Sequence, residues 1–226
     1  FATITGKAFR PRPMDMGRMA WVLFGVCCLY VFLAVVLPVA ALLLTSLQRF
    51  ATVILGQAEF TLANYQTALS LGPVRTAMGN SLLLGFGVAT VGVIVMAVLV
   101  WIIYRSTLRG RGAIEYLVMF PGAVPRLVFG LALLWAWLNI PIPIYGTLWL
   151  LALAYFTVML PLGVRTLAGV VLQIDRSLEE CARVCGAGWA YQMRTVTLPL
   201  LKPGILAAWL LIFMACVREL GASVFL

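Results

Sequence analysis

Three charged side chains lie inside otherwise apolar stretches of the sequence. Arg126 falls in the run 114–138, and Arg218 and Glu219 fall in the run 205–226. A charge at the centre of a bilayer costs about 2.5–3.5 kcal/mol on insertion scales, so such groups face a bundle interior or a cavity. One hypothesis is a solute path, in which Glu219 meets a cation or the arginines meet an anion. The alternative is an ion pair of Arg126 with Glu219 that only holds the helices together. Arg218 would not share this partner with Glu219, because adjacent residues on a helix do not face one partner.

Residues that commonly bind metals or act as nucleophiles are scarce. Histidine is absent, which excludes histidine proton relays, histidine metal sites and Ser-His-Asp triads. Cys27, Cys28 and Cys216 lie within apolar runs, and Cys181 and Cys185 have no further ligands nearby. We interpret all five as small packing residues. The sequence therefore predicts no catalytic residue, no metal site and no cofactor bound by this chain.

The composition indicates a membrane protein. Hydrophobic residues make up 64% of the 226 residues and charged residues 10%, against roughly 45–50% and about 25% in soluble domains. This excess excludes a soluble enzyme, a collagen-like fibre, a disordered tail and a small disulfide scaffold. The net charge of +9 would suggest nucleic acid for a soluble protein. Here basic cytoplasmic loops explain it, and the predicted partner is the lipid bilayer rather than nucleic acid.

Five apolar runs could cross a bilayer as helices, each of which needs about 20 residues. They cover residues 21–44, 81–104, 114–138, 147–164 and 205–226. Such runs are too long for barrel strands, so the predicted fold class is all-α. A transmembrane domain over 21–226 would then follow a tail of residues 1–20 and include a polar loop at 165–202.

The basic residues orient these runs. If the five runs alternate, the tail and the loops after the second and fourth runs share one side, and these segments hold 12 of the 16 lysines and arginines. The opposite side holds only Arg49 and Arg75. Because cytoplasmic loops carry the excess of Lys and Arg, the N-terminal tail and the loop 165–202 are predicted to be cytoplasmic.

The segment after the first run contains a further predicted element. Phe60, Leu62, Tyr65 and Leu69 recur at roughly helical spacing after Thr61, a residue type suited to an N-cap. This pattern predicts a short helix near the outer interface.

The loop 165–202 has two predicted short helices. Ser177 and Glu180 have the spacing of a capping box, which predicts a helix that the glycines within 186–188 end or bend. A second helix from Trp189 should stop before Pro199, because the residue before a proline disfavours the α region. Two short helices at an angle would suit docking into a soluble partner. An inert loop that only covers the helix ends is an equal alternative on these grounds.

This loop resembles the EAA loop of ABC importer permeases. That pattern reads Glu-Ala-Ala, three residues, Gly, nine residues, then Ile-x-Leu-Pro, and the sequence departs from it at Cys181 and Val196. In that family the loop forms the coupling helix that inserts into the ATP-hydrolysing subunit. The resemblance implies this role for residues 177–199. The residues expected to couple to the ATPase are Glu179, Glu180, Ala182, Arg183, Gly186, Ala187, Leu198 and Pro199.

The likeness extends beyond the loop. The segments 60–65 and 80–84 resemble the permease core, and residues 3–12 and 218–223 resemble the second half of fused ferric-iron-type permeases. The resemblance implies a type I ABC importer permease-like bundle, with five transmembrane helices of an expected six in this half. We therefore expect sequence to be missing at both ends, with a homologous half fused upstream and a sixth helix downstream.

The resemblance also implies a function. A permease of the bacterial inner membrane would move a solute, delivered by an external solute-binding protein, by alternating access. Ferric iron is the first candidate solute, and thiamine, phosphonate, sulfate and polyamines are others. The sequence lacks the Gly-x-x-x-x-Gly-Lys-Ser/Thr phosphate-binding motif. We therefore expect no enzyme activity in this chain, with ATP and Mg²⁺ on a dimeric ABC ATP-binding subunit. The alternative is a secondary transporter with no ATPase partner, for which only Glu219 offers an intramembrane acid.

Overall fold

The computed structural model describes residues 16–50 and 59–226, and the chain divides into one unit of residues 2–76 and one of residues 77–226. Within the described residues, the regular structure is helical apart from one isolated antiparallel bridge between Gln48 and Phe60. The predicted all-α fold class is thereby confirmed. The tail 1–15, including the segment that resembles a permease linker, lies outside the described residues.

One long helix makes up most of the described part of the first unit. It consists of α1 (Met19–Val31), a π-helical segment η1 (Phe32–Val36) and α2 (Leu37–Leu47). Pro38 accounts for the π-helical segment, because proline offers no N–H to the preceding turn and its ring needs the space of a wider turn. The combined helix has 29 residues and its most apolar window is entirely unburied, as expected for a helix that meets lipid or other chains.

A short helix follows within the same unit, as predicted. It is α3 (Ala63–Ser70), and the Asn64 side chain amide donates to the backbone oxygens of Ser46 at 3.0 Å and Gln48 at 2.8 Å. These bonds tie α3 to the end of α2. The Thr61 hydroxyl accepts the first backbone N–H of α3 at 3.1 Å, although Thr61 stands one position before the N-cap residue.

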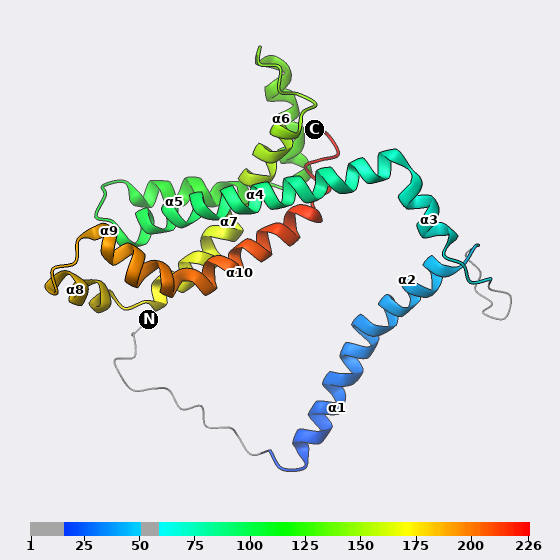
Figure 1. Ribbon diagram of the computed structural model, residues 1–226, viewed down its shortest axis with the longest axis horizontal. Coiled ribbons are helices and arrows are strands. Elements are labelled where there is room, and N and C mark those ends of the chain that lie inside the picture. The colour runs from blue at the N-terminus through cyan, green and yellow to red at the C-terminus, as the bar shows by residue number, and fades with distance from the viewer. Residues whose placement is uncertain (1–15, 51–58) are drawn as a thin grey trace. The chain divides into compact units, whose positions relative to one another are not determined.

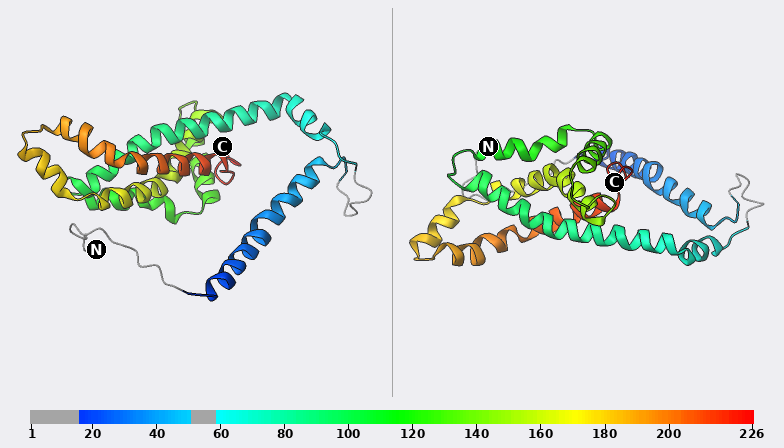
Figure 2. Two further views of the ribbon diagram at one scale, coloured as in Figure 1. Left: turned by 60° about the horizontal axis from the view of Figure 1, so that its bottom comes forward. Right: turned by 90° about the horizontal axis from the view of Figure 1, so that it is seen from above.

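Three long helices form the core of the second unit. They are α4 (Gly72–Arg105), α7 (Leu148–Gln173) and α10 (Leu198–Val217), and α7 and α10 run beside α4 in Figures 1 and 2. Met96 and Ile212 have no exposed surface. Gly163 allows this packing: a Cβ there would lie 3.0 Å from Ile212 Cδ1 and would overlap the Met96 sulfur.

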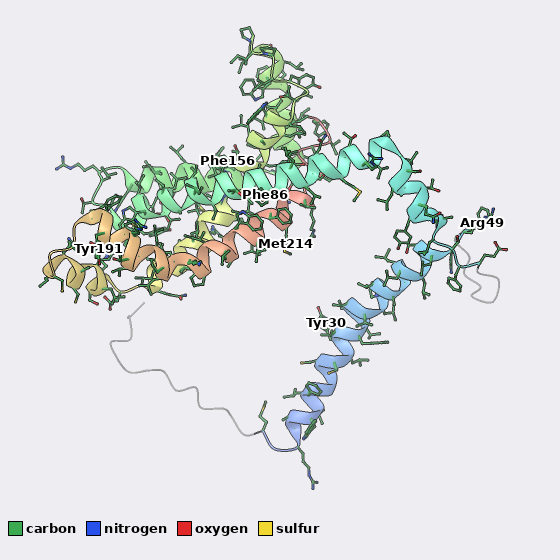
Figure 3. The ribbon with its side chains drawn as sticks, viewed as in Figure 1. Tyr30, Arg49, Phe86, Phe156, Tyr191 and Met214 are labelled. Atoms are coloured by element: carbon green, nitrogen blue, oxygen red, sulfur yellow. The ribbon has the colours of Figure 1, made fainter. Side chains whose placement is uncertain are left out.

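Aromatic side chains join α4 to α10 at a second point. The Trp209 indole N–H donates to the Thr90 hydroxyl at 3.0 Å. The indole also stacks on the Phe213 ring at 5.3 Å and meets Phe86, labelled in Figure 3, edge to face at 5.5 Å. A hydrogen-bonded indole within a cluster of rings is a favourable way to bury its polar N–H.

The predicted third run, 114–138, is not one straight helix. It consists of α5 (Arg111–Met119), a 3₁₀ turn η3 (Phe120–Ala123) and α6 (Arg126–Asn139), and the helix axis bends by 105° between the two arms. Pro125 explains the break, because it cannot donate to the preceding turn and it forces the residue before it out of the helical region. This bend places Arg126 at the start of a helix rather than in the middle of one.

Two other predicted runs have different ends in the structure. The predicted end at 164 is wrong, because α7 continues through Pro161 to Gln173. Helices within membranes often tolerate a proline, since neighbouring groups satisfy the backbone groups that it leaves free. The predicted run 205–226 begins earlier, at Leu198, and its helix ends at Val217. Among the described residues, four helices are long and apolar enough to cross a membrane, and the bent pair is a fifth if its arms count as one span.

Candidate functional sites

The loop after α7 begins with a capped helix. This helix is α8 (Arg176–Val184), and its N-cap is Asp175, whose Oδ1 accepts the Ser177 backbone N–H at 2.9 Å. The bond lowers the pKa of Asp175, because the backbone N–H stabilises the charged carboxylate. The predicted capping box of Ser177 and Glu180 is therefore wrong by two residues, since aspartate is an equally good N-cap residue and precedes the serine.

The end of α8 is a glycine cap, as predicted. Gly186 has a φ of +83°, a value that suits a residue without Cβ. Its N–H donates to the Arg183 carbonyl at 2.9 Å, and the Ala187 N–H donates to the Ala182 carbonyl at 3.0 Å. These two bonds are those of a Schellman motif, which satisfies the last carbonyls of the helix and turns the chain.

The second predicted helix does not stop before Pro199. After the extended Gly188, α9 (Trp189–Gln192) passes through a π-helical segment, η4 (Met193–Thr197), directly into α10. Pro199 lies in the first turn of α10. Proline is tolerated there, and the wider π-helical turn before it leaves room for the ring.

The predicted coupling residues differ in exposure. Glu179 is buried, with 7% of its surface exposed. Ala182 and Ala187 are half-buried. The remaining predicted coupling residues are exposed: Glu180, Arg183, Gly186, Leu198 and Pro199. The α8–α9 region therefore presents Glu180, Arg183 and Gly186 on its surface, at one end of the bundle beyond the ends of α4 and α7 (Figure 1).

Glu179 points inward to a residue that sequence reasoning did not assign to a site, Arg105 at the end of α4. The Arg105 Nη1 lies 3.4 Å from the Glu179 Oε1, and the two side chains are 5% and 10% exposed. The separation is that of an ion pair without hydrogen-bond geometry. Arg105 Nη2 instead donates to the carbonyls of Val171, at 2.7 Å, and Ile174. The sequence offers no signal for this pairing beyond a basic residue at the end of an uncharged run.

A cavity of about 360 Å³ adjoins this ion pair. Its lining comes from the end of α4, from α8, from the turn after α8 and from both ends of α9. The lining residues are Trp101, Arg105, Glu179, Arg183, Ala187, Trp189 and Gln192.

A second ion pair joins two of the charges predicted to lie in the membrane. The Arg126 Nη1 donates to the Glu219 Oε2 at 2.7 Å, with side-chain exposures of 57% and 1%. Arg126 is the first residue of α6, and Glu219 follows the end of α10. Arg218 does not join them: its side chain is exposed, and the part of the chain that the structure describes gives it no ion-pair partner.

Glu219 is also bonded through its backbone and through its second oxygen. Its carbonyl accepts the Tyr155 hydroxyl of α7 at 3.1 Å, and its Oε1 accepts the Ala222 N–H at 3.3 Å. Gly130 of α6 packs against Ala222, where a Cβ would lie 3.0 Å from the Ala222 carbonyl oxygen. The segment after α10 is thus held between α6 and α7. Tyr155 was not singled out in the sequence, where it is one aromatic residue in an apolar run.

Metal binding finds no support in the described ranges, 16–50 and 59–226. These ranges contain no group of three or more His, Cys, Asp or Glu side chains that could hold a metal ion. Cys181 and Cys185 are both exposed on the α8 region.

Residues 104–226 match the family described as the binding-protein-dependent transport system inner membrane component. The match begins at the end of α4 and includes both ion pairs. A relative in Salmonella paratyphi A is named as a 2-aminoethylphosphonate transport system permease protein, PhnV. It is 31% identical over 193 residues, which cover 83% of this chain and 70% of the relative.

Two longer relatives are also similar. The Fe(3+)-transport system permease protein FbpB 2 of Haemophilus influenzae is 32% identical over 153 residues, covering 67% of this chain and 30% of the relative. The ABC transporter permease protein y4fN of Sinorhizobium fredii is 30% identical over 175 residues, covering 74% of this chain and 31% of the relative. The chain therefore spans less than a third of the length of these two proteins.

Proposed function

Because the chain belongs to the family of binding-protein-dependent transport system inner membrane components, we propose that α8 and α9 form the coupling region that docks on an ABC ATP-binding subunit. This family membership makes the chain a multi-pass permease component of an ABC importer. The observation that carries the proposal is the α8–α9 region itself. It is a capped helix and a Schellman turn that present Glu180, Arg183 and Gly186 on an exposed surface.

The proposed transport cycle follows from this docking. A solute-binding protein delivers the solute on the far side of the membrane. The partner dimer binds ATP and Mg²⁺ and closes. This closure carries α8 with it and rotates the spans between inward-facing and outward-facing states. We further propose that the N-terminal tail 1–20 and α8 are cytoplasmic, that residues 21–226 form the transmembrane domain, and that a homologous permease half is fused upstream.

Affinity purification of the full-length protein tests the docking. We expect an ABC ATP-binding subunit to co-purify with wild type and to be lost from Glu180→Arg, because the substitution reverses an exposed charge on the docking surface. Arg109→Glu is the matched control: it reverses an exposed charge on the loop between α4 and α5 and should retain the ATPase. If no ATPase accompanies any of these proteins, the coupling proposal fails and a secondary transporter becomes the better hypothesis.

For the transported solute we propose ferric iron as the first candidate, on the likeness to FbpB 2, a ferric-iron permease by its name. A phosphonate is the second candidate, on the likeness to PhnV and on one structural observation. The Glu219 carboxylate is buried and ion-paired with Arg126. The Arg126 side chain is 57% exposed and has further N–H groups that could donate to an anion. Thiamine, sulfate and polyamines have no such support from the relatives compared with this chain.

Uptake measurements separate the two candidates. Cells that express the complete transporter should accumulate either radiolabelled iron or 2-aminoethylphosphonate. If Arg126 lies on the solute path, Arg126→Ala should reduce uptake at equal expression, whereas Arg218→Ala, which removes an unpaired exposed charge, serves for comparison. Uptake by Arg126→Ala equal to that of wild type would remove Arg126 from the path.

A further inference from the structure

Arg105 is the point at which three helices of the second unit meet. It is the last residue of α4, its guanidinium donates to the carbonyls of Val171 and Ile174 at the end of α7, and it pairs with Glu179 of α8. The last carbonyls of a helix lack intrahelical partners and carry partial negative charge. One cation therefore caps α7 and holds the carboxylate of α8 at the same time.

A second bond reinforces the same contact. Arg176, the first residue of α8, donates from Nη2 to the Tyr104 carbonyl at 2.9 Å. Arg176 and Glu179 are three residues apart and so share a face of the helix. That face of α8 is attached to the end of α4, whereas Glu180 and Val184 remain exposed, Val184 at 88%.

The covalent connection alone does not fix α8. Only Ile174 and Asp175 lie between the end of α7 and the start of α8, and the backbone angles of two residues allow a short helix to pivot. The Arg105–Glu179 pair removes this freedom. Both side chains are at least nine-tenths buried, and a buried charge left without its partner is strongly unfavourable.

We propose that Arg105 is a positioning residue that locks the coupling helix to the bundle, so that a displacement at the free face of α8 moves α4 and α7 with it. The inference rests on the proposed contact between α8 and an ATPase. It also assigns Glu179 a role different from the other predicted coupling residues, because its carboxylate faces this chain and not the partner.

The experiment uses the full-length permease with its ATPase and binding protein in proteoliposomes. Arg105→Gln removes the charge, Arg105→Lys keeps the charge without the forked guanidinium, and Arg109→Gln is the control on the adjacent exposed loop. Two quantities are measured: solute transported per ATP hydrolysed, and the distance distribution between spin labels on Cys181 of α8 and on Tyr116→Cys of α5. Both labelled positions are exposed, and every other cysteine of the full-length protein is replaced.

We expect Arg105→Gln to retain the ATPase, to broaden the label distance distribution and to lower the solute moved per ATP by roughly tenfold, in the range found for residues that couple distant sites. Arg105→Lys should fall between Arg105→Gln and wild type, and Arg109→Gln should match wild type. The double variant Arg105→Gln/Glu179→Gln should be no worse than Arg105→Gln, because the two residues act through one another. If Arg105→Gln does not fold, Arg105→Lys decides by the same two measurements.

A wild-type distance distribution together with wild-type coupling in the Arg105 variants would overturn the inference. The proposed function would still stand in that case if Glu180→Arg lost the ATPase. If no ATPase binds to any variant, the proposed function fails, and an unchanged label distribution in Arg105→Gln would separately show that Arg105 does not hold α8.

Discussion

The two Arg–Glu ion pairs of the second unit differ in which partner water can reach. In the Arg105–Glu179 pair both side chains are buried, at 5% and 10% exposure. In the Arg126–Glu219 pair the acid is buried at 1% exposure and the base is 57% exposed. Both pairs join an arginine to a glutamate, and the two differ in how far the arginine side chain is exposed.

The hydrogen bonds support the distinction. Arg105 bonds to backbone carbonyls and stands 3.4 Å from its carboxylate, so its guanidinium is enclosed by this chain. Arg126 makes one short bond of 2.7 Å to Glu219 and presents the rest of its guanidinium outward. The enclosed pair is shielded from water on both sides, whereas the half-open pair leaves part of the Arg126 guanidinium accessible from outside the chain.

The largest predicted effect compares the loss of the two arginines. Arg105→Ala should lower the free energy of unfolding by about 3–5 kcal/mol, the range for breaking a buried pair from one side. Arg126→Ala should lower it by about 1–3 kcal/mol, because removal of a half-exposed side chain opens a path for water to Glu219. Detergent unfolding of the full-length protein measures both. An equal loss, or the reverse order, would show that exposure does not distinguish the pairs.

The two pairs also differ in how far the sequence could predict them. Arg126 and Glu219 are conspicuous as charges within apolar runs, and their pairing was one of two hypotheses from the sequence. Arg105 and Glu179 each look like ordinary residues at a span end and in a polar loop. Their meeting depends on how far α7 extends, and the sequence placed the end of that run nine residues too early, at 164 rather than at Gln173.

Local signals explain which elements were predicted well. Gly186 ends α8 as expected, because its left-handed conformation is a backbone requirement that the sequence shows directly. The proline rules were less reliable. A helix was expected to stop before Pro199, but Pro199 lies in the first turn of α10, and Pro125 breaks a run that was predicted as one span. Neighbouring helices and π-helical turns decide these cases, and neither is visible in one sequence.

A change in the shared core should disturb both pairs together. Both depend on α7, Arg105 through the Val171 carbonyl and Glu219 through Tyr155. Gly163→Ala would bring a methyl group onto the Met96 sulfur and should lower the free energy of unfolding by about 1–3 kcal/mol, the cost of overpacking. Unfolding in detergent measures this loss, and the same substitution should cost less in a Met96→Ala background, where the overlapping sulfur is absent. An equal cost in both backgrounds would mean that α7 does not press on α4 at this point.

A smaller effect on stability is expected at the C-terminal end of α8, which the Arg105–Glu179 pair does not hold. Gly186→Ala places a Cβ at a φ of +83° and should cost about 1–2 kcal/mol in local stability. Gly188→Ala is the matched control, because Gly188 has a φ of −66° and no atom within 4 Å of an added Cβ. Hydrogen exchange at the Gly186 and Ala187 amides should accelerate in the first variant only. Equal exchange in both would contradict the cap.

The smallest predicted effect concerns the cap at the other end of α8, beside Arg105. The Ser177 N–H lowers the pKa of Asp175 in the folded protein. The stabilisation is therefore fully present above the ordinary aspartate value of about 4 and is lost as the pH falls through the lower folded-state value. Asp175→Asn keeps a cap that does not titrate. Wild type should be slightly more stable in thermal unfolding near neutral pH, and this difference should vanish in acid. If the difference persists in acid, the charge of Asp175 does not stabilise α8, and the Arg105–Glu179 pair holds this end of the helix without help from the cap.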